Sequence, residues 1–339
     1  MDLYKILLIP DLEGWCWWHR CCAIRDFCEY VNIHIDVICQ GDVTQEMLDK
    51  YRAVLVMSWP DAPNWTHPNL WTFVANEGTV YPFPHIASDP KYKRTASRLK
   101  NIRTAQEKLP RYAGVININS RIQETLCRLH PNVRYMRTGV HVNFWDQCYP
   151  PQTTLPITIG WSGKSFDDPN KWTPKGYQEV LVPVRQECLR LFGKDVFWEV
   201  NRAAWGKNML TPESQREFYS GSDVFLVTSC SEGTPSVLME AMSCGRMAIT
   251  TDVGIAREIE REMIADGCPE DQLPIRIVDR WGTRDEADAT VQQIIEQIGM
   301  VLNEHDQIAV RGEMARMAMC QHFDWLNIAD EWVDLILKG

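Results

Sequence analysis

Short runs of apolar and β-branched residues alternate along this 339-residue chain with longer stretches of helical periodicity. That alternation predicts βαβ units and parallel sheets, so an α/β fold is expected. The strands expected in the first part are KILLIP, HIDVICQ, AVLVMS, TVYPF, VININS and VRYMRT, and those in the second are ITIGWS, VFWEV, DVFLVTS, MAITT and IRIV. In doubly wound sheets of this kind, ligands bind beyond the carboxyl ends of the strands.

A proline-rich stretch, CYPPQTTLP at residues 148–156, separates the two sets of strands and indicates a linker. The length also exceeds what one hydrophobic core ordinarily serves. We therefore expect two doubly wound domains facing a cleft, over residues 1–150 and 151–310, followed by terminal helices over residues 311–339.

The composition is that of a globular protein, with 45% apolar and 24% charged residues, and no apolar run approaches the ~18 residues of a membrane span. The start MDLYKILLIPDLEG has acids near both ends and predicts a first strand instead of a signal peptide. A cytoplasmic location is expected, where the 12 cysteines would stay reduced. The group of Cys16, Cys21, Cys22, Cys28 and His19 matches no zinc spacing, so no metal site is predicted.

Charge is distributed unevenly along the chain. The net charge of −10 argues against a protein that coats nucleic acid. Between Pro90 and Tyr112, however, eight basic residues stand against a single acid, Glu107. Apolar residues recur there at every third or fourth position, which predicts an amphipathic helix with a cationic surface. That surface is either simply solvated or a docking face for an anionic partner, with Arg94 and Arg98 as the candidate contacts.

The segment SCSEGTPSVLMEAMSCG, residues 229–245, carries two glutamates inside an apolar run. It follows a predicted buried strand. Thr234 and Pro235 predict a helix start, with Thr234 as the N-cap and Pro235 at the first helical position. Glu232 should therefore lie in the loop ahead of the helix, and Glu240 inside the helix.

A helix N-terminus presents free N–H groups and a partial positive charge, which suit a diphosphate. Gly233 would let a ligand approach the backbone, and the amides of Ser236 and Val237 are the expected phosphate donors. Because carboxylates accept hydrogen bonds from hydroxyl groups, Glu232 could hold a sugar and Glu240 a ribose. A ligand that carries a sugar and a ribose on either side of a diphosphate is a nucleoside-diphosphate sugar. In the alternative interpretation, Glu232 only balances the helix dipole and Glu240 lies on a polar helix face.

Three segments carry a resemblance to a known family. SEGTPSVLMEAMSCGRMAITTDVGIAREI resembles the E-x7-E segment of family 4 retaining glycosyltransferases, which have the GT-B fold of two Rossmann-like domains. VININSRIQETLCRLHPNVRYMRTGVHVNFW is similar to the end of the N-domain in that family, and HFDWLNIADEWVDLILKG resembles the terminal helices that cross back over it. The resemblance extends from about residue 113 to the end of the chain.

The resemblance implies a set of site residues. Lys164 and Lys175 match the two basic ligands of the pyrophosphate, with Lys171 as a competitor for the second place. His85 matches a histidine that lies near the transferred sugar. The implied donor site further comprises Gly14, Gly163, Gly233, Thr234, Pro235, Ser236, Val237 and Glu240.

The implied reaction is the retaining transfer of a sugar from a nucleoside-diphosphate sugar, with a UDP-sugar as the expected donor, to an acceptor hydroxyl. Lys164, Lys175 and the helix would stabilise the leaving diphosphate without a cofactor or metal, because the sequence has no Asp-x-Asp after an apolar strand to hold Mg²⁺. The alternatives are a sugar-nucleotide epimerase of GT-B fold and a catalytically inactive nucleotide-sugar-binding protein.

The acceptor side is expected to be rich in tryptophan. Trp15 and Trp59 lie on loops expected to face the cleft, and they would provide stacking platforms unless they belong to the core. With the basic helix they favour an anionic acceptor, which could be DNA, a lipid-linked intermediate at a membrane surface, or an acidic glycan. The start PDLEGWCWWHR is also similar to phage glycosyltransferases that modify hydroxymethylated DNA bases. The sequence does not predict an oligomeric state.

Overall fold

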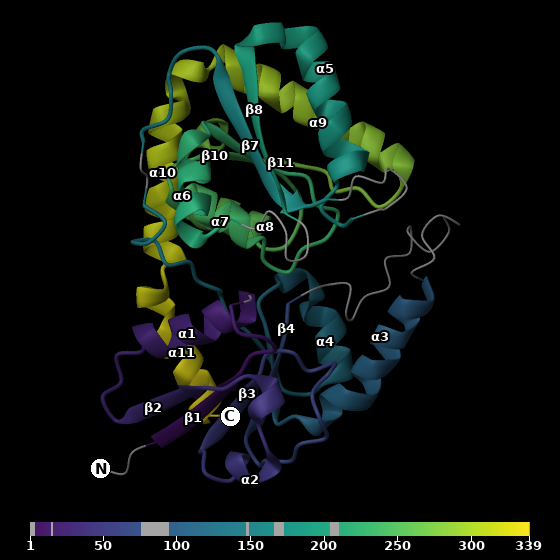
Figure 1. Cartoon of the computed structure of the whole chain (residues 1–339), viewed down its shortest axis with the longest axis vertical. Coiled ribbons are helices and arrows are strands. Elements are labelled where there is room, and N and C mark those ends of the chain that lie inside the picture. The colour runs from purple at the N-terminus through teal and green to yellow at the C-terminus, as the bar shows by residue number, and fades with distance from the viewer. Residues whose placement is uncertain are drawn as a thin grey trace. The chain divides into compact units, whose positions relative to one another are not determined.

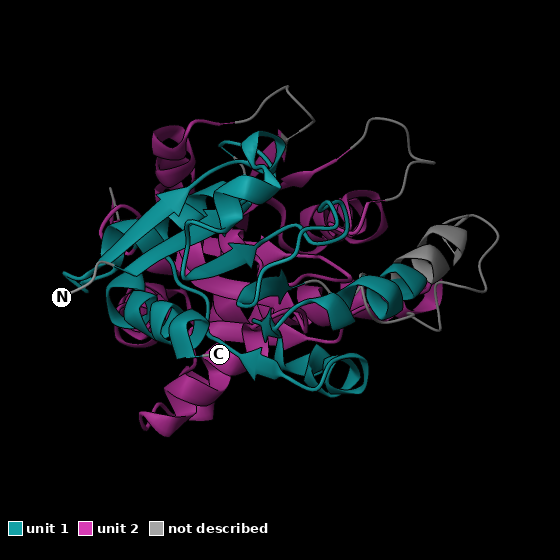
Figure 2. Ribbon diagram, turned by 90° about the horizontal axis from the view of Figure 1, so that it is seen from below, with its two compact units in different colours: residues 1–82, 94–141, 323–339 teal, residues 83–93, 142–322 magenta. Residues whose placement is uncertain are grey.

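The computed structural model describes residues 4–14, 16–75, 95–146, 149–165, 173–203 and 210–338, with the backbone alone for 95–101 and 203. The chain divides into two compact units (Figure 2). The first comprises residues 1–82, 94–141 and 323–339, and the second comprises residues 83–93 and 142–322. The later borders between the units fall after residues 141 and 322, where the sequence indicates 150 and 310.

The first unit holds a six-stranded sheet in the order β2-β1-β3-β4-β5-β6, in which all pairs are parallel (Figure 1). Its strands are β1 (Tyr4–Ile9), β2 (Ile33–Val37), β3 (Ala53–Val56), β4 (Leu70–Val74), β5 (Gly114–Asn117) and β6 (Val133–Tyr135). Its helices are α1 (Cys16–Phe27), α2 (Gln45–Leu48), α3 (Thr95–Lys108), α4 (Gln123–Leu129) and α11 (Trp325–Lys338). The strand expected at TVYPF lies outside the described residues, and β4 is formed instead by LWTFV.

Helices cover both faces of this sheet, which explains why its central strands are almost continuously apolar. On one face, α1 and the C-terminal helix α11 pack side by side (Figure 1). The indoles of Trp325 and Trp332 are buried there with Phe73. Trp332 Nε1 also donates to the Arg137 carbonyl at 2.8 Å. The last helix of the chain is therefore part of the core of the first unit.

The second unit holds a five-stranded parallel sheet in the order β11-β10-β9-β7-β8. Its strands are β7 (Ile157–Lys164), β8 (Val196–Ala203), β9 (Val224–Val227), β10 (Met247–Thr251) and β11 (Ile275–Val278). Its helices are α5 (Val182–Phe192), α6 (Pro212–Gly221), α7 (Ser236–Ser243), α8 (Ala256–Ala265), α9 (Arg284–Asn303) and α10 (Ile308–His322).

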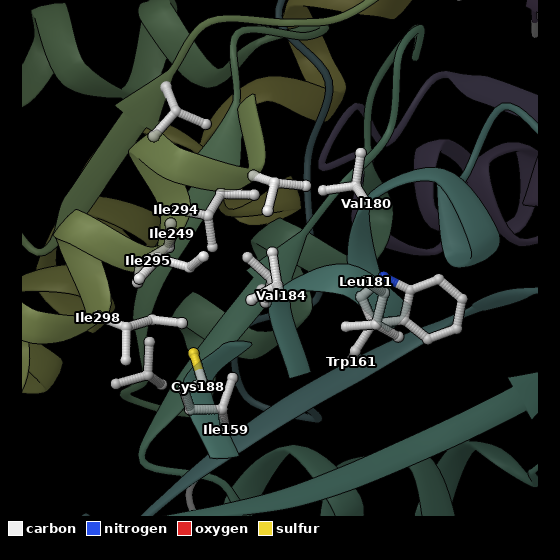
Figure 3. Packing of buried hydrophobic residues seen from close by; sticks show 14 of the residues in the cluster. Ile159, Trp161, Val180, Leu181, Val184, Cys188, Ile249, Ile294, Ile295 and Ile298 are labelled. Carbon is white, nitrogen blue, oxygen red and sulfur yellow. The ribbon is translucent and has the colours of Figure 1, made fainter. Parts of the chain in front are cut away.

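The core of the second unit lies between the sheet and the pair α5 and α9, where Ile159, Val184, Ile249 and Ile294 interdigitate (Figure 3). Trp161, near the carboxyl end of β7, also belongs to this core. The sheet edge that follows Trp161 is thus anchored on a tightly packed interior.

Two further findings concern the whole of the described chain. Among its helices, none is both long enough and apolar enough to cross a bilayer. The described cysteines are all free thiols, and no group of three or more His, Cys, Asp or Glu side chains in the described ranges could hold a metal ion.

Candidate functional site

The strand order of the second unit reverses between β7 and β9. The chain passes from β7 to β8 on one side and then crosses to β9 on the other, so the loops that leave the carboxyl ends diverge at this point. Such a switch point is where open parallel sheets bind ligands. A small pocket lies here, with no room for a water molecule, and its lining comprises Trp161, Ser162, Lys175, Val227, Thr228, Ser229 and Val237.

Two buried indoles hold the turn after β9. Trp161 Nε1 donates to Thr228 Oγ1 at 2.9 Å, and Trp281 Nε1 donates to the Thr228 carbonyl at 2.9 Å. The Thr228 hydroxyl donates in turn to the Lys175 carbonyl at 2.6 Å. Gly176 has a φ of +68°, and a Cβ added there would lie 2.3 Å from the Thr228 carbonyl oxygen. Only glycine permits this approach, which fixes the backbone of Lys175 against the turn.

The Lys175 ammonium reaches the loop carboxylate that precedes α7. Its Nζ lies 2.6 Å from Glu232 Oε1, and Ser229 Oγ donates to the same oxygen at 2.7 Å. The Glu232 side chain is 12% exposed and that of Lys175 is 29% exposed. The structure thus brings together two predicted site residues that are 57 positions apart in the sequence.

Helix α7 begins one residue later than the sequence predicts. Pro235 is its N-cap, with φ −71° and ψ 90°, and the Pro235 carbonyl accepts the first helical hydrogen bond, from Leu238 N–H at 2.9 Å. The prediction of Thr234 as N-cap is therefore wrong, and within the described residues the buried Thr234 hydroxyl makes no hydrogen bond. The amides of Ser236 and Val237 precede the first helical bond and point out of the helix N-terminus, where an anion could bind.

Glu240 lies in the second turn of α7, where the Tyr219 hydroxyl of α6 donates to its Oε2 at 2.7 Å. Burial raises the pKa of Glu240 to about 7, although the Tyr219 hydrogen bond and the charge of Lys175 both act to lower it. Burial, together with the charge of Glu240, also raises the pKa of Tyr219 well above its usual value. Glu240 is therefore a half-buried group that gains and loses its proton near neutral pH, and not a solvated residue of a polar helix face.

The predicted residues Gly163 and Lys164 form the end of β7. A Cβ added to Gly163 would lie 2.9 Å from the Trp161 ring, so this strand end is closely packed. Beside it, on β8, the Arg202 guanidinium lies 4.6 Å from the centroid of the Tyr177 ring. Arg202 is not among the predicted site residues, because the expected strand VFWEV ends before it, whereas β8 continues to Ala203. Its position at the end of an apolar run was the only available signal.

The structure describes only some of the site residues that were predicted in the first unit. Gly14 has a φ of +75° in the turn after β1, and a Cβ added there would meet no atom within 4 Å. Trp59 is only 2% exposed and belongs to a hydrophobic cluster, so the prediction that its ring forms a stacking platform is wrong, because no face of the ring is open. Outside the described residues lie Trp15, His85, Arg94 and Lys171, and of Arg98 only the backbone is described, in α3.

The sequence has recognisable relatives in this region. Residues 208–267 match the family model described as "Glycosyl transferases group 1". "Alpha-maltose-1-phosphate synthase" of Mycobacterium tuberculosis is 29% identical over 168 residues, and that of Mycolicibacterium smegmatis is 25% identical over 166 residues. These alignments cover 49% of this chain, which thus spans 38% of the length of the curated relatives it matches.

Solved structures resemble the whole chain. The sucrose-phosphate synthase from Thermosynechococcus elongatus has a TM-score of 0.64 at 15% identity, over 99% of this chain and 98% of that one. Anabaena Alr3699/HepE in complex with UDP-glucose has a TM-score of 0.61 at 12% identity, over 99% and 100%. At these identities the likeness concerns the fold. The chain has the GT-B fold, and its residues 208–267, which include Glu232 and Glu240, match the glycosyl transferases group 1 model.

Proposed function

We propose that the protein is a glycosyltransferase that takes its sugar from a UDP-sugar bound at the carboxyl edge of the second unit. The observation that carries this proposal is the contact between Lys175 and Glu232 just before α7. Glu232 and α7 lie within residues 208–267, which match the glycosyl transferases group 1 model. The half-buried Glu240 lies on the same helix. The Anabaena structures that share the fold are described as complexes with UDP, UDP and glucose, and UDP-glucose.

In this proposal the diphosphate lies at the N-terminus of α7. The amides of Ser236 and Val237 donate to its oxygens, and Lys164 and Lys175 supply positive charge that becomes more stabilising as the leaving group gains negative charge. In this proposal the chain's own residues supply the positive charge that stabilises the leaving diphosphate, and no metal or cofactor takes part. Hydroxyl groups of the sugar would donate to Glu232.

The proposed transfer retains configuration at the anomeric carbon. The bond between this carbon and the diphosphate oxygen breaks, and the acceptor oxygen bonds to the same face of the carbon. The acceptor proton leaves with the departing UDP, whose oxygen becomes the base. Glu240, with its ionised form present at neutral pH, would accept hydrogen bonds from the ribose hydroxyls.

For the acceptor we propose an anionic molecule, in line with the basic segment that contains α3. The described part of that segment exposes Arg103 and Arg111, whereas Lys108 is bonded to backbone carbonyls of its own unit. A DNA base of the phage type, a lipid-linked intermediate and an acidic glycan are the three candidate acceptors. A family 4 assignment and a cytoplasmic location belong to this proposal as well.

The decisive experiment measures what happens to a panel of nucleoside-diphosphate sugars. Transfer, or slow hydrolysis with release of UDP, supports the transferase. A new stereoisomer of the intact donor would instead indicate an epimerase, and binding without turnover an inactive binding protein. Glu232→Ala should reduce turnover by about a hundredfold or more with the fold intact, since it removes a group placed at the reacting sugar. Normal turnover in this variant would refute the proposed donor site.

A further inference from the structure

The connection between β3 and β4 in the first unit is unusual for a parallel pair. Neighbouring parallel strands are ordinarily joined through a helix, but residues 57–69 pass from β3 to β4 without any helix or strand. Loops of this length without secondary structure are uncommon in compact domains and are usually functional when they occur. The loop is therefore expected to form a binding surface as well as to connect the two strands.

Side chains from neighbouring elements hold this loop in one conformation. Lys108 Nζ donates to the carbonyls of Pro60 and Ala62 at 2.6 and 3.1 Å. Gln45 forms a paired contact with the backbone of Thr66, in which its Nε2 donates to the carbonyl at 2.7 Å and its Oε1 accepts from the amide at 2.9 Å. Such a loop is preorganised, so a ligand would not have to order it.

A groove of about 710 Å³ lies along the second half of the loop. This volume falls within the range of about 300–1,000 Å³ that is typical of small-molecule sites. Trp65, which is 8% exposed, and Pro68 supply apolar surface. The polar groups of the groove come from Asp49, Asn64, Thr66, His67 and Arg111.

The histidine of the groove is fully engaged by the backbone. His67 Nδ1 accepts from Asn69 N–H at 3.1 Å, so its Nε2 carries the proton, which it donates to the Tyr51 carbonyl at 3.0 Å. No ring nitrogen is left for a metal or for proton transfer. His67 therefore holds the loop in place and offers no ring nitrogen to a ligand.

The charges of the groove balance, which limits the kind of ligand. Arg111 donates to Asn64 Oδ1 and stands against one carboxylate, that of Asp49. Within the described residues, the exposed Asp49 carboxylate and the Thr66 hydroxyl make no side-chain hydrogen bond to the protein. The groove thus offers acceptors and donors beside an apolar surface, without the excess of positive charge that phosphate groups require.

We propose that this groove is a binding site for a neutral oligosaccharide, separate from the donor site. A sugar ring presents an apolar face of C–H groups, which fits Trp65 and Pro68, and a rim of hydroxyls, which fits Asp49, Thr66 and Arg111. The groove residues immediately precede β3, β4 and β5, so they lie at the amino edge of the sheet. The carboxyl edge, where the loops of such sheets bind reactants, is about 15 Å away along the strands.

The position of the groove has a consequence that rests on the proposed function. A glycan held at the amino edge of this sheet lies away from the carboxyl-edge loops of the same sheet, where reactants bind. The groove would therefore hold a neutral part of a longer acceptor, a part that is not itself modified. Binding itself does not depend on transfer. An assay without any nucleotide sugar therefore tests the groove alone, and its failure would leave the proposed transferase activity untouched.

The test uses the full chain and calorimetric titration with two neutral pentasaccharides, maltopentaose and cellopentaose, and with the acidic pentagalacturonate. At least one neutral pentasaccharide should bind at millimolar concentration or below. Asp49→Ala and Thr66→Ala should each weaken that binding about fivefold, the loss expected for one hydrogen bond. Asp61→Ala changes an exposed carboxylate on the same loop outside the groove lining and is the matched control, with unchanged binding.

Three results would overturn the proposal. They are the absence of binding by both neutral pentasaccharides, binding of the acidic one alone, and neutral binding that Asp49→Ala and Thr66→Ala leave unchanged. Circular dichroism of each variant verifies folding. Both side chains are free of bonds to the protein in the described structure, so either variant should fold and the pair keeps the test decisive.

Discussion

Replacing Glu232 by glutamine should strengthen the binding of UDP, even though Glu232 lies in the proposed donor site. In the structure, the Lys175 ammonium is held 2.6 Å from Glu232 Oε1. A diphosphate has to compete with this carboxylate for Lys175, and the carboxylate also repels it as a like charge. Glutamine keeps the shape and an oxygen that can accept from Ser229, but it removes the negative charge.

The expected gain follows from the surroundings of the pair. Exposed ion pairs contribute about 0–1 kcal/mol, and this pair is less screened, with side chains 12% and 29% exposed. A charge-assisted hydrogen bond that must be broken before Lys175 can reach the phosphates costs about 1 kcal/mol in such a setting. This corresponds to about fivefold in Kd, and relief of the repulsion acts in the same direction, so UDP should bind about three- to tenfold more tightly.

Calorimetric titration of UDP into the two proteins measures this gain, which should shrink as added salt screens the charges. Glu217→Gln removes the same charge from an exposed position on α6 and should leave the affinity within about twofold of the wild type. Unchanged or weaker UDP binding by a well-folded Glu232→Gln protein would refute the idea that the carboxylate competes with the diphosphate for Lys175.

Because burial raises the pKa of Glu240 to about 7, its ionised fraction, and with it the affinity for uridine, should rise about tenfold between pH 6 and pH 8. A flat uridine profile in the wild-type protein, or a rise that survives in Glu240→Gln, would contradict this. The raised pKa also means that the folded protein binds this proton more tightly than the unfolded chain, with its ordinary value of 4.5. The free energy of unfolding should therefore fall by about 3 kcal/mol as the pH rises from below 4.5 to above 7, and urea titrations of Glu240→Gln should lack this component. Gly176→Ala, whose Cβ would lie 2.3 Å from the Thr228 carbonyl at a φ of +68°, should lose about 3 kcal/mol of stability in urea titrations. Gly267→Ala, at the end of α8 with a φ of +90° and no atom within 4 Å, should lose only about 1 kcal/mol, and equal losses would show that the contact with Thr228 is unimportant.

The sheets could largely be predicted from the sequence because strands buried on both faces are nearly continuous apolar runs. Strand β4 shows where this approach fails. Its sequence LWTFV follows a stretch with other tryptophans, and it lies between the expected strands AVLVMS and TVYPF without being predicted as a strand. In the structure, a Cβ added to Gly114 of β5 would lie 2.2 Å from the Trp71 ring, so that ring lies flat on the neighbouring strand. A contact between strands so far apart in the sequence leaves no local signal.

The candidate site was only partly predictable for a similar reason. Local preferences correctly indicated a helix after Glu232 but placed its N-cap one residue early, at Thr234 instead of Pro235. The backbone there is shaped by a distant turn, because a Cβ added to Gly254 would lie 2.6 Å from the Gly233 carbonyl oxygen and 2.7 Å from Pro235 Cδ. Tertiary packing of this kind overrides the preference of a single residue for the N-cap position.

Glu232, in the loop before α7, and Glu240, within α7, have different electrostatic surroundings, and the charge of Lys175 acts on both. Glu232 has Lys175 as its direct partner at 2.6 Å, whereas the half-buried Glu240 lies beside Tyr219 and is affected by the charge of Lys175 at a distance. A diphosphate that attracts Lys175 would therefore deprive Glu232 of its partner and Glu240 of a favourable charge at the same time. Hydroxyl groups compensate both losses, since they donate to ionised carboxylates. A complete nucleoside-diphosphate sugar supplies hydroxyls on both sides of its diphosphate, and pyrophosphate supplies none. The site should therefore bind the complete donor more favourably than it binds pyrophosphate.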